Sequence, residues 1–467
     1  MANQIEKADP ARLAACRVLR DVLNEGGFSN DSAAIHLSSP DLLPRDRAFA
    51  SALIYGTLAR IPLIDAWLER LSARPFEKLD PWMQNVLRLG AWQLHFSYAV
   101  PAHTAVDESV KLIRFLSGDR ATAYVNGILR SLSRELPAIP AKKLLAYELG
   151  LSTELYGLFR HWYGDDMARK IALAALESPS MQTVRLDLRR QAEVDEWLTS
   201  NEAVELEAQK APWPEEAMSI NLAGKALNEL SAYKEGLFTA QSSSAMLSGS
   251  LLPEELLQRD NLRVIDLCSA PGGKIGHLAE RLNPEAKLIA CDISPERLEL
   301  VRGFMKSRNH NNVEYRVLDA SKALPFENIF DLVLCDVPCS GLGLLARRPE
   351  IRLRAGYEAI ERLKPLQEAI LQEASCLVAP GGWLYYTTCT INPDENSGQI
   401  KKFLESDRGK EFSLDNLRLE LPDALMQTYD ISAERNDLNG DVSLFAHRDG
   451  SDGFYLARMR RSRIEGK

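Results

Sequence analysis

The sequence predicts an α + α/β protein in three parts: an N-terminal all-α bundle, a small connecting α/β subdomain, and a C-terminal open sheet of mostly parallel strands. Up to about residue 136, apolar residues recur three and four positions apart, which is the spacing of amphipathic helices. From about residue 237, strand-like apolar runs alternate with helical stretches, as in parallel sheets with helices on both faces. Since 467 residues exceed what one hydrophobic core accommodates, we expect domains over residues 1–143, 144–235 and 236–467.

Proline marks the predicted helix boundaries in the first part. Asp80-Pro81 precedes a helix over residues 82–94, and Pro101 separates it from a helix over residues 104–115. The middle part has a short strand-like run at residues 181–188 and a proline-containing loop, and we find no catalytic constellation in it. Neither part defines a function through its helix pattern alone.

The composition, 45% hydrophobic and 26% charged, is typical of a globular protein. No apolar run approaches the ~18 residues needed to cross a bilayer, and the first ten residues lack the apolar core of a signal peptide. We therefore expect a cytoplasmic protein with no membrane partner. The sequence leaves the oligomeric state open, and a monomer is favoured. The net charge of −9 argues against nonspecific nucleic-acid binding by the whole surface, although a local basic face is compatible with it.

The seven cysteines are an odd number spread along the chain, which argues against a disulfide framework. None forms a C-x-x-C pair and no histidine cluster accompanies them, so no metal site is expected. Cys268, Cys291, Cys335 and Cys376 fit the usual role of cysteine as a small buried hydrophobic residue.

The C-terminal sheet is predicted to place its ligands at one edge. The predicted strands cover residues 262–267, 287–291, 313–318, 331–335 and 383–387, with helices over 295–307 and 357–378. In such sheets, ligands bind at the carboxyl ends of the strands. The first of these strands ends in a loop over residues 266–274 whose two glycines, at a strand-to-helix turn, allow close approach of a ligand to the backbone. This loop is neither G-x-G-x-x-G nor a Walker A sequence, which weakens nicotinamide and nucleoside-triphosphate interpretations.

Acidic residues end the next three predicted strands. Asp292 is placed to accept hydrogen bonds from ribose hydroxyls, and Asp319 and Asp336 follow at the same edge. Asp292 and Asp319 could instead cap helices or turns, which aspartate commonly does. The ordered set favours a ligand with a carboxylate, an ammonium group and an adenosine, and it predicts S-adenosylmethionine as the cofactor.

Two thiols follow strands of the same sheet. Cys339 lies in Asp336-Val337-Pro338-Cys339-Ser340-Gly341 and Cys389 in Tyr386-Thr387-Thr388-Cys389-Thr390. Carbon 5 of cytosine is a poor nucleophile, and attack of a thiolate at carbon 6 makes it enamine-like and able to take a methyl group. A base must then remove the proton on carbon 5 before the thiolate leaves.

These motifs, together with Asp292-Ile293-Ser294-Pro295-Glu296-Arg297-Leu298 and Asn392-Pro393-Asp394-Glu395-Asn396, resemble the RNA cytosine-5 methyltransferase family. Residues 87–94, 101–108 and 124–130 resemble the NusB-like domain, a helical RNA-binding module, although a helical scaffold without RNA contact fits their spacing too. The combination resembles the bacterial Fmu/Sun-type 16S ribosomal RNA enzymes over nearly the whole chain. It implies a Rossmann-like catalytic domain and 16S ribosomal RNA as the partner.

The resemblance also implies residue roles. Cys389 is the nucleophile at carbon 6, and Cys339 assists breakdown of the covalent adduct. Cofactor contacts are implied for Cys268, Ser269, Ala270, Pro271, Gly272, Gly273, Lys274, Asp292, Asp319 and Asp336, with Arg297 as a further candidate. Asp336 fits a contact to the Watson–Crick edge of the cytosine equally well, and Lys274 fits a solvated helix start.

The chain departs from the family pattern at two places. Gln241-Ser242 stands where the family has Gln-Asp, and Arg352-Leu353 stands where a Trp is common. Arg347, Arg348 and Arg352 are candidates for phosphate contacts, and a second run of arginines crowds the C-terminus, although a solvated face is the commoner explanation of a charge run. The target base must be unpaired or flipped to reach a thiol in a cleft.

Three alternatives remain at this level: a transfer-RNA or DNA cytosine methyltransferase, and a non-catalytic RNA-binding assembly or antitermination factor. The two thiols and the glycine loop count against the non-catalytic alternative. A DNA enzyme is expected to attack from the cysteine of the Pro-Cys motif. The cysteine whose replacement abolishes the covalent adduct therefore separates a DNA enzyme from an RNA enzyme.

Overall fold

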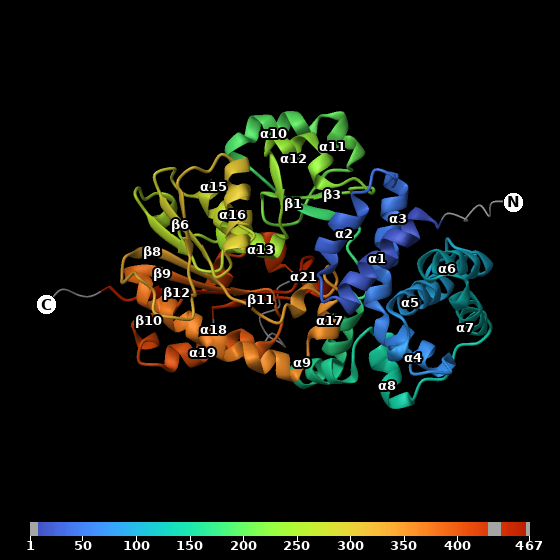
Figure 1. Cartoon of the computed structure of the whole chain (residues 1–467). Helices are drawn as coiled ribbons and strands as arrows, with labels where there is room; N and C mark the ends of the chain where they lie inside the picture. Colours follow the sequence, from blue (N-terminus) through green and yellow to red (C-terminus); the bar gives the residue numbers. More distant parts are fainter. Residues whose placement is uncertain (1–7, 428–439, 464–467) are drawn as a thin grey trace. The chain divides into compact units, whose positions relative to one another are not determined.

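The computed structural model describes residues 8–427 and 440–463 (Figure 1). The chain forms two compact units. The N-terminal unit comprises Met1–Pro179, Leu222–Ala226 and Leu345–Ala355, and the C-terminal unit comprises Ser180–Asn221, Leu227–Leu344 and Gly356–Lys467. The first seven residues, part of the ten in which the sequence showed no signal-peptide core, lie outside the described residues.

The N-terminal unit is helical, as predicted. Its helices are α1 (Pro10–Asn24), α2 (Ser29–Leu37), α3 (Pro44–Ala59), α4 (Ile61–Leu71), α5 (Pro81–Phe96), α6 (Ala102–Ser117), α7 (Thr122–Arg134), α8 (Ala141–Glu148) and α9 (Thr153–Ala174). The predicted start of α5 is confirmed, since the Asp80 side chain accepts hydrogen bonds from the amides of Trp82 and Met83. Among the described residues no single helix is long and apolar enough to cross a membrane; α3 and α4, bent by 77°, pass that test only as a pair.

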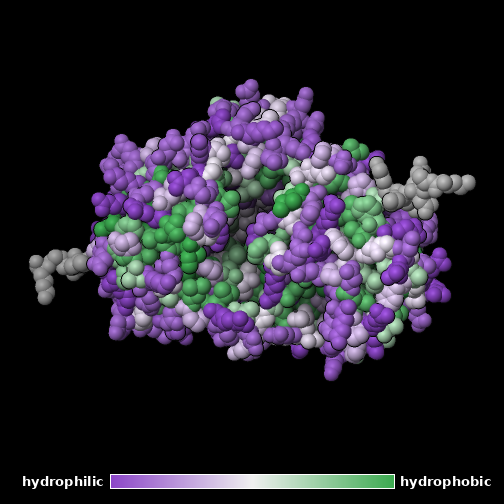
Figure 2. Space-filling view, in the orientation of Figure 1, coloured by the Kyte–Doolittle hydropathy of each residue, from purple (hydrophilic) through white to green (hydrophobic). Residues whose placement is uncertain are grey.

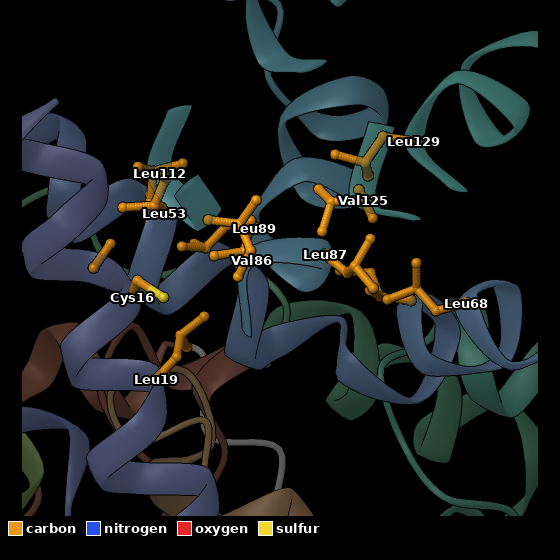
Figure 3. Packing of buried hydrophobic residues seen from close by; sticks show 14 of the residues in the cluster. Cys16, Leu19, Leu53, Leu68, Val86, Leu87, Leu89, Leu112, Val125 and Leu129 are labelled. Atoms are coloured by element: carbon orange, nitrogen blue, oxygen red, sulfur yellow. The ribbon is translucent and has the colours of Figure 1, made fainter. Parts of the chain in front are cut away.

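Helix α5 is the centre of the bundle. Figure 3 shows Val86 and Leu89 directed toward the side chains of α1 and α3, and Leu87 directed toward α4 and α7. These three α5 side chains are at most 1% exposed. Because α5 contributes apolar side chains in several directions, it is buried on more than one face, and the surrounding helices need only one apolar stripe each.

The C-terminal unit contains the predicted sheet. Its strands are β5 (Arg263–Asp266), β6 (Lys287–Asp292), β7 (Val313–Val317), β8 (Phe330–Asp336), β9 (Val378–Thr388), β10 (Phe412–Leu414), β11 (Val442–Leu444) and β12 (Phe454–Arg461). The strand order is β10-β12-β9-β8-β5-β6-β7, with β11 paired to β12. The five strands from β9 to β7 are parallel, as predicted, and β10, β11 and β12 form an antiparallel extension.

Helices cover both faces of this sheet (Figure 1). On one face, α13 (Ser243–Ser250), α15 (Gly273–Arg281) and α16 (Pro295–Ser307) pack on Leu332 and Leu334 of β8. On the other, α18 (Tyr357–Leu377) and α19 (Ser397–Glu405) pack on Val333 and Cys335. Since successive side chains of a strand point to opposite faces, an apolar run such as β8 fills both cores at once.

The antiparallel extension corrects the interpretation of the C-terminal arginines. Arg458 of β12 is 1% exposed, and its Nε donates to the Asp415 carboxylate over 2.6 Å while Nη1 donates to Glu420 over 2.9 Å. Arg461 is also buried, and its Nε donates to Glu411 over 2.9 Å. These guanidinium groups are already paired inside the protein, so they are no RNA-binding face.

A small antiparallel sheet precedes the large one in the same unit. It has the order β2-β3-β1-β4, with β1 at Gln182–Leu186, β2 at Gln209–Lys210, β3 at Ala217–Ile220 and β4 at Phe238–Ala240. Helices α10 (Gln191–Leu198), α11 (Asn201–Glu205) and α12 (Ser231–Glu235) accompany it, and their surface in Figure 2 is largely hydrophilic. This is the predicted small α/β subdomain.

One segment of the C-terminal sequence, Leu345–Ala355, belongs to the N-terminal unit. Its Arg352 is 1% exposed and donates to the carbonyl oxygens of Ala59 and Ala175, each over 2.7 Å, and of Leu345 over 3.0 Å. Glu350, also buried, accepts from the backbone and hydroxyl of Ser29 over 3.1 and 2.7 Å. The prediction that Arg352 contacts RNA is therefore wrong, because its donors are used inside the protein.

Arg347 and Arg348 precede that buried arginine in the same segment. Arg347 is half-buried, and Arg348 is exposed. Unlike Arg352, both side chains are accessible to solvent, Arg348 more than Arg347. Their assignment to phosphate contacts stays a prediction.

Replacing Arg352 by methionine is expected to destabilise the N-terminal unit by about 3 kcal/mol, because buried carbonyl groups lose their donors while side-chain volume is largely kept. Thermal unfolding and hydrogen exchange at the ends of α3 and α9 measure this. Arg348→Met, at an exposed position of the same segment, should change the stability by about 0.5 kcal/mol or less. Equal melting temperatures for Arg352→Met and the wild type would contradict a structural role for this guanidinium.

Candidate active site

The two predicted thiols meet at the carboxyl edge of the sheet. Strand β8 pairs in parallel with β9, and Asp336 stands opposite Thr387 in this register. Cys339 and Cys389 follow those strands, and their sulfur atoms lie 3.3 Å apart. This separation is within hydrogen-bonding distance for sulfur, so one thiol donates to the other.

The protonation of Cys339 follows from this contact. The hydrogen bond with Cys389 and burial both raise the pKa of Cys339 well above that of an ordinary thiol. Cys339 is therefore a neutral thiol near pH 7. Either sulfur of the pair can be the donor in this contact.

Backbone contacts hold the two thiol loops close together. The amide of Gly343 donates to the carbonyl of Cys389 over 3.0 Å, and the amide of Gly453 donates to the carbonyl of Gly343 over 3.0 Å. A Cβ atom at Gly343 would lie 2.1 Å from the Gly453 oxygen and 2.7 Å from the Cys389 oxygen. Only glycine permits this approach.

An ion pair stands beside the thiols. The Lys274 ammonium donates to Asp336 Oδ2 over 2.5 Å, and the Thr387 hydroxyl donates to Asp336 Oδ1 over 2.7 Å. Burial lowers the pKa of Lys274, but the charges of Asp336, Cys389 and Asp266 outweigh it, and the pKa is raised overall. Lys274 is thus a fixed cation at the sheet edge and no solvated helix start.

Asp266 lies beneath this pair at the end of β5. It is fully buried, and its Oδ1 accepts from the amide of Cys268 over 3.4 Å. Burial, followed by the charge of Asp336, raises the pKa of Asp266 to about 7. The carboxylates of Asp266 and Asp336 therefore both interact with the single positive charge of Lys274.

The glycine loop is fixed by local hydrogen bonds. The amide of Ser269 donates to the carbonyl of Cys291 on β6 over 2.8 Å, and the amide of Gly272 donates to the carbonyl of Ser269 over 2.7 Å. Gly272 has φ +110° at the start of α15, and a Cβ there would lie 3.0 Å from Phe304. The carbonyls of Ala270 and Gly273 accept hydrogen bonds from Arg297 over 3.2 Å and from Arg185 over 2.9 Å. The turn leads into the N-terminus of α15, which fits an S-adenosylmethionine carboxylate.

The acids after β6 and β7 differ from each other. Asp292 is 3% exposed, accepts from the amide of Ser294 over 3.0 Å, and lies 3.7 Å from the Arg297 guanidinium. Asp319 is partly exposed, and hydrogen bonds from Lys322 and Ser321 lower its pKa to about 2. Asp319 is therefore engaged in its own turn, as the capping alternative anticipates, and the cofactor role of both acids stays a prediction.

Sequence reasoning missed the residues that support the glycine loop from the small sheet. Arg185 of β1 is 1% exposed, donates to the carbonyl of Gly273 over 2.9 Å and pairs with Glu280 of α15 over 2.7 Å. It also donates to the side chain of Gln241, which is the residue of the Gln241-Ser242 pair that agrees with the family pattern. No local pattern marks Arg185, because its partners lie far away in the sequence.

A second buried pair joins His277 of α15 to Glu216, the residue before β3. His277 Nε2 is 2.9 Å from Glu216 Oε1, and both side chains are at most 4% exposed. Burial and the charge of Arg185 lower the pKa of His277. His277 is therefore neutral at pH 7, with its Nε2 close to the Glu216 carboxylate. Among the described residues no group of three or more His, Cys, Asp or Glu side chains is arranged to hold a metal ion.

A Rossmann-like parallel sheet with a glycine turn, strand-end acids and a helical N-terminal unit defines an S-adenosylmethionine-dependent methyltransferase with a NusB-like domain. Comparisons with known proteins agree. The model of the family described as 16S rRNA methyltransferase RsmB/F matches residues 254–460, and that of the NusB family matches residues 9–134. The chain belongs to the RsmB/F family of ribosomal RNA methyltransferases, and the predicted resemblance and cofactor are confirmed.

Individual relatives cover nearly the whole chain. The ribosomal RNA small subunit methyltransferase B of Xanthomonas campestris is 30% identical over 85% of this chain and 87% of its own. The probable ribosomal RNA small subunit methyltransferase B of Synechocystis is 28% identical over 97% of this chain and 99% of its own.

Solved structures share the fold. The crystal structure of PH0851 has a TM-score of 0.82 at 23% identity and covers 97% of this chain and 99% of its own. NSun6 from Pyrococcus horikoshii, solved with SFG, has a TM-score of 0.54 at 20% identity and covers 66% of this chain and 97% of its own.

Replacing Gly272 by alanine is expected to weaken S-adenosylmethionine binding about tenfold, since a left-handed alanine and its contact with Phe304 cost about 1–2 kcal/mol. Isothermal titration calorimetry measures the affinity. Gly303→Ala, on neighbouring α16 with open space around the added methyl, is the matched control and should bind like the wild type. Equal affinities for the two variants would contradict a role of the glycine turn.

The stability of the C-terminal unit is expected to fall as the pH drops below about 6.5, the pKa of histidine in the unfolded chain. Because the folded-state pKa of His277 is lowered, the unfolded chain binds a proton there that the folded protein excludes. The loss is at most about 1.4 kcal/mol per pH unit. Denaturant unfolding between pH 7.5 and 5.5 should show a steeper decline for the wild type than for His277→Gln; equal slopes would contradict it.

Proposed function

We propose that this chain methylates carbon 5 of a cytosine in 16S ribosomal RNA through a covalent bond between Cys389 and carbon 6. The observation that carries this proposal is the pair of sulfur atoms 3.3 Å apart, beside the Lys274–Asp336 ion pair at the edge where cofactors bind in such sheets. A methyltransferase acting on an already nucleophilic atom has no use for two thiols there.

The charges around the pair support Cys389 as the nucleophile. We assign the S–H donor role to Cys339, whose pKa is raised well above that of an ordinary thiol, so that its hydrogen bond stabilises a thiolate on Cys389. The Lys274 cation also interacts electrostatically with Cys389, which favours the charged form. Both effects make Cys389 the stronger nucleophile of the two.

Lys274 and Asp336 suit the cytosine ring. We assign Asp336 to accept from the exocyclic amine and Lys274 to donate to the ring carbonyl oxygen, since acceptor and donor stand side by side. A cation near that oxygen withdraws electron density and makes carbon 6 more electrophilic. The Lys274–Asp336 ion pair then both positions the cytosine ring and activates its carbon 6.

The cofactor site is assigned to residues 268–273 with Asp292, Asp319 and Arg297 at the following strand ends. S-adenosylmethionine, when bound, supplies an electrophilic methyl group. The N-terminus of α15 fits the carboxylate of S-adenosylmethionine, and the buried Asp292 fits its ribose hydroxyls. These residues bind and orient the cofactor, and the two thiols act on the cytosine.

Adduct breakdown is assigned to Cys339. A base accepts the proton from carbon 5, the electron pair of that C–H bond re-forms the double bond between carbons 5 and 6, and the bond from carbon 6 to sulfur breaks so that Cys389 leaves as a thiolate. The Cys339 S–H, 3.3 Å away, stabilises that departing charge as it did the attacking one. The Cys339 S–H thus assists both the formation and the breaking of the bond between Cys389 and carbon 6.

The substrate assignment rests on the family, whose printed description and relatives' names refer to 16S and small-subunit ribosomal RNA. The exposed Arg348 and half-buried Arg347 are proposed phosphate contacts, and residues 1–143 a NusB-like RNA-binding domain. The divisions at residues 143 and 235 stay part of this proposal.

Labelled S-adenosylmethionine with unmodified small-subunit ribosomal RNA tests the proposal, with transfer RNA as the control substrate. Label is expected in a ribosomal cytosine as 5-methylcytosine, and Cys389→Ala should abolish it because no adduct forms. Label in transfer RNA, or ribosomal label that survives in Cys389→Ala, would contradict the assignment.

Cys339→Ser should instead accumulate a denaturation-resistant protein–RNA adduct, since attack by Cys389 remains and breakdown fails. Gel electrophoresis of labelled RNA after denaturation detects it, and Cys339→Ser/Cys389→Ala is the control that should show none. A folded Cys339→Ser protein without adduct would count against the two-thiol mechanism.

A further inference from the structure

The carboxylate of Glu395 lies inside the C-terminal unit between the two thiol loops. The residue is fully buried, and its carboxylate accepts four hydrogen bonds. The donors are the amide of Ser340 at 2.8 Å, the hydroxyl of Ser340, the side chain of Gln367 at 2.9 Å and the side chain of Asn392 at 3.0 Å. Burying a carboxylate is costly, and a set of neutral donors offsets that cost only if the donors stay in place.

These donors belong to both loops. Ser340 directly follows Cys339, and Gln367 of α18 also donates to the carbonyl of Pro338, directly before Cys339, over 2.9 Å. Asn392 lies in the loop that begins at Cys389. One carboxylate therefore joins the backbone on either side of Cys339 to the loop of Cys389.

The two loops depend on this carboxylate to different degrees. The Cys389 loop has further contacts of its own: Thr388 donates to the Asn396 side chain over 2.6 Å, and Asn396 donates to the carbonyl of Thr390 over 3.0 Å. Ser340, in contrast, gives both its amide and its hydroxyl to Glu395, and its hydroxyl has one further partner, the Thr390 hydroxyl at 2.7 Å. Loss of the carboxylate should loosen Cys339 more than Cys389.

We propose that Glu395 is a positioning residue that keeps the Cys339 thiol within reach of the Cys389 sulfur during breakdown of the covalent adduct. This inference rests on the proposed two-thiol function. It assigns Glu395 to the second half of the reaction, because the nucleophile has independent support and the assisting thiol has less. Glu395 acts through Ser340 and Gln367 and does not touch the reacting base.

Glu395→Gln is the direct test, because glutamine keeps the volume and replaces one acceptor oxygen by an NH2 group that faces other donors. Turnover is expected to fall at least tenfold, while the first methyl transfer changes less and the share of enzyme trapped as a protein–RNA adduct rises above that of the wild type. Single-turnover methyl transfer and denaturing gels on the full-length protein measure both. Adduct should vanish in Glu395→Gln/Cys389→Ala.

Asp394→Asn is the matched control. Asp394 precedes Glu395, and its carboxylate is 57% exposed and 3.7 Å from the Lys364 ammonium. The control also removes one negative charge from the same loop, so it should behave like the wild type if the contacts of Glu395 matter and its charge alone does not. Adduct in Asp394→Asn equal to that in Glu395→Gln would overturn the proposal.

Two further results would overturn it. Wild-type turnover in a folded Glu395→Gln protein is one, and an equal loss of adduct formation and breakdown is the other, since that is what a purely structural residue produces. If Glu395→Gln fails to fold by its melting curve, Ser340→Ala, which removes a single hydroxyl, replaces it; adduct should rise, and unchanged turnover and adduct would reject the proposal.

Cys339→Ser in the same assay separates this inference from the proposed function. Adduct in Cys339→Ser but none in Glu395→Gln rejects only the role of Glu395. Absence of adduct in both variants, with folding intact, rejects the two-thiol reaction on which the inference rests.

Discussion

The parallel pairing of β8 with β9 is the constraint on which the site depends. Parallel strands end at the same edge of a sheet, and the register that sets Asp336 opposite Thr387 also brings the two following loops side by side. Both strands are buried on each face, so a slip by one residue would exchange the two cores and is strongly disfavoured. The 3.3 Å separation of the thiols is thus a consequence of sheet register.

Charge at this edge is arranged around a single lysine. Lys274 pairs with Asp336, while Asp266 is buried below with a pKa raised to about 7 by burial and by Asp336. One cation near two carboxylates leaves them competing for it, and burial together with the charge of Asp336 keeps Asp266 partly protonated near pH 7. The Thr387 hydroxyl and the Lys274 ammonium hold the Asp336 carboxylate in place through one hydrogen bond to each oxygen. The fold thus fixes the positions of this ion pair.

The sequence predicted what hydropathy and local chemistry encode. Helix α16 was placed at its observed bounds, and the motifs around Cys339 and Cys389 pointed to the edge where the thiols meet. Buried arginines were not predictable, because a charged side chain indicates solvent until its partners are known. Arg352 donates hydrogen bonds to carbonyl groups of distant segments, and Arg458 pairs with Asp415 and Glu420, so neither was recognisable as part of a core. Glu395 lay inside a quoted motif, but its role depends on Ser340 and Gln367, which only the fold brings to it.

The buried Arg352 also changes how the N-terminal helices contribute to the enzyme. The segment that follows the Cys339 loop continues into the N-terminal unit, where Arg352 and Glu350 are held by carbonyl and amide groups of the bundle. A guanidinium with these partners is stable only when they are folded around it, since an arginine buried without acceptors is costly. The bundle therefore includes a segment from the C-terminal half of the sequence in its own core. The helical pattern of residues 1–143 could not reveal this, because the charged residues that complete the core lie more than 170 residues away from the helices they contact.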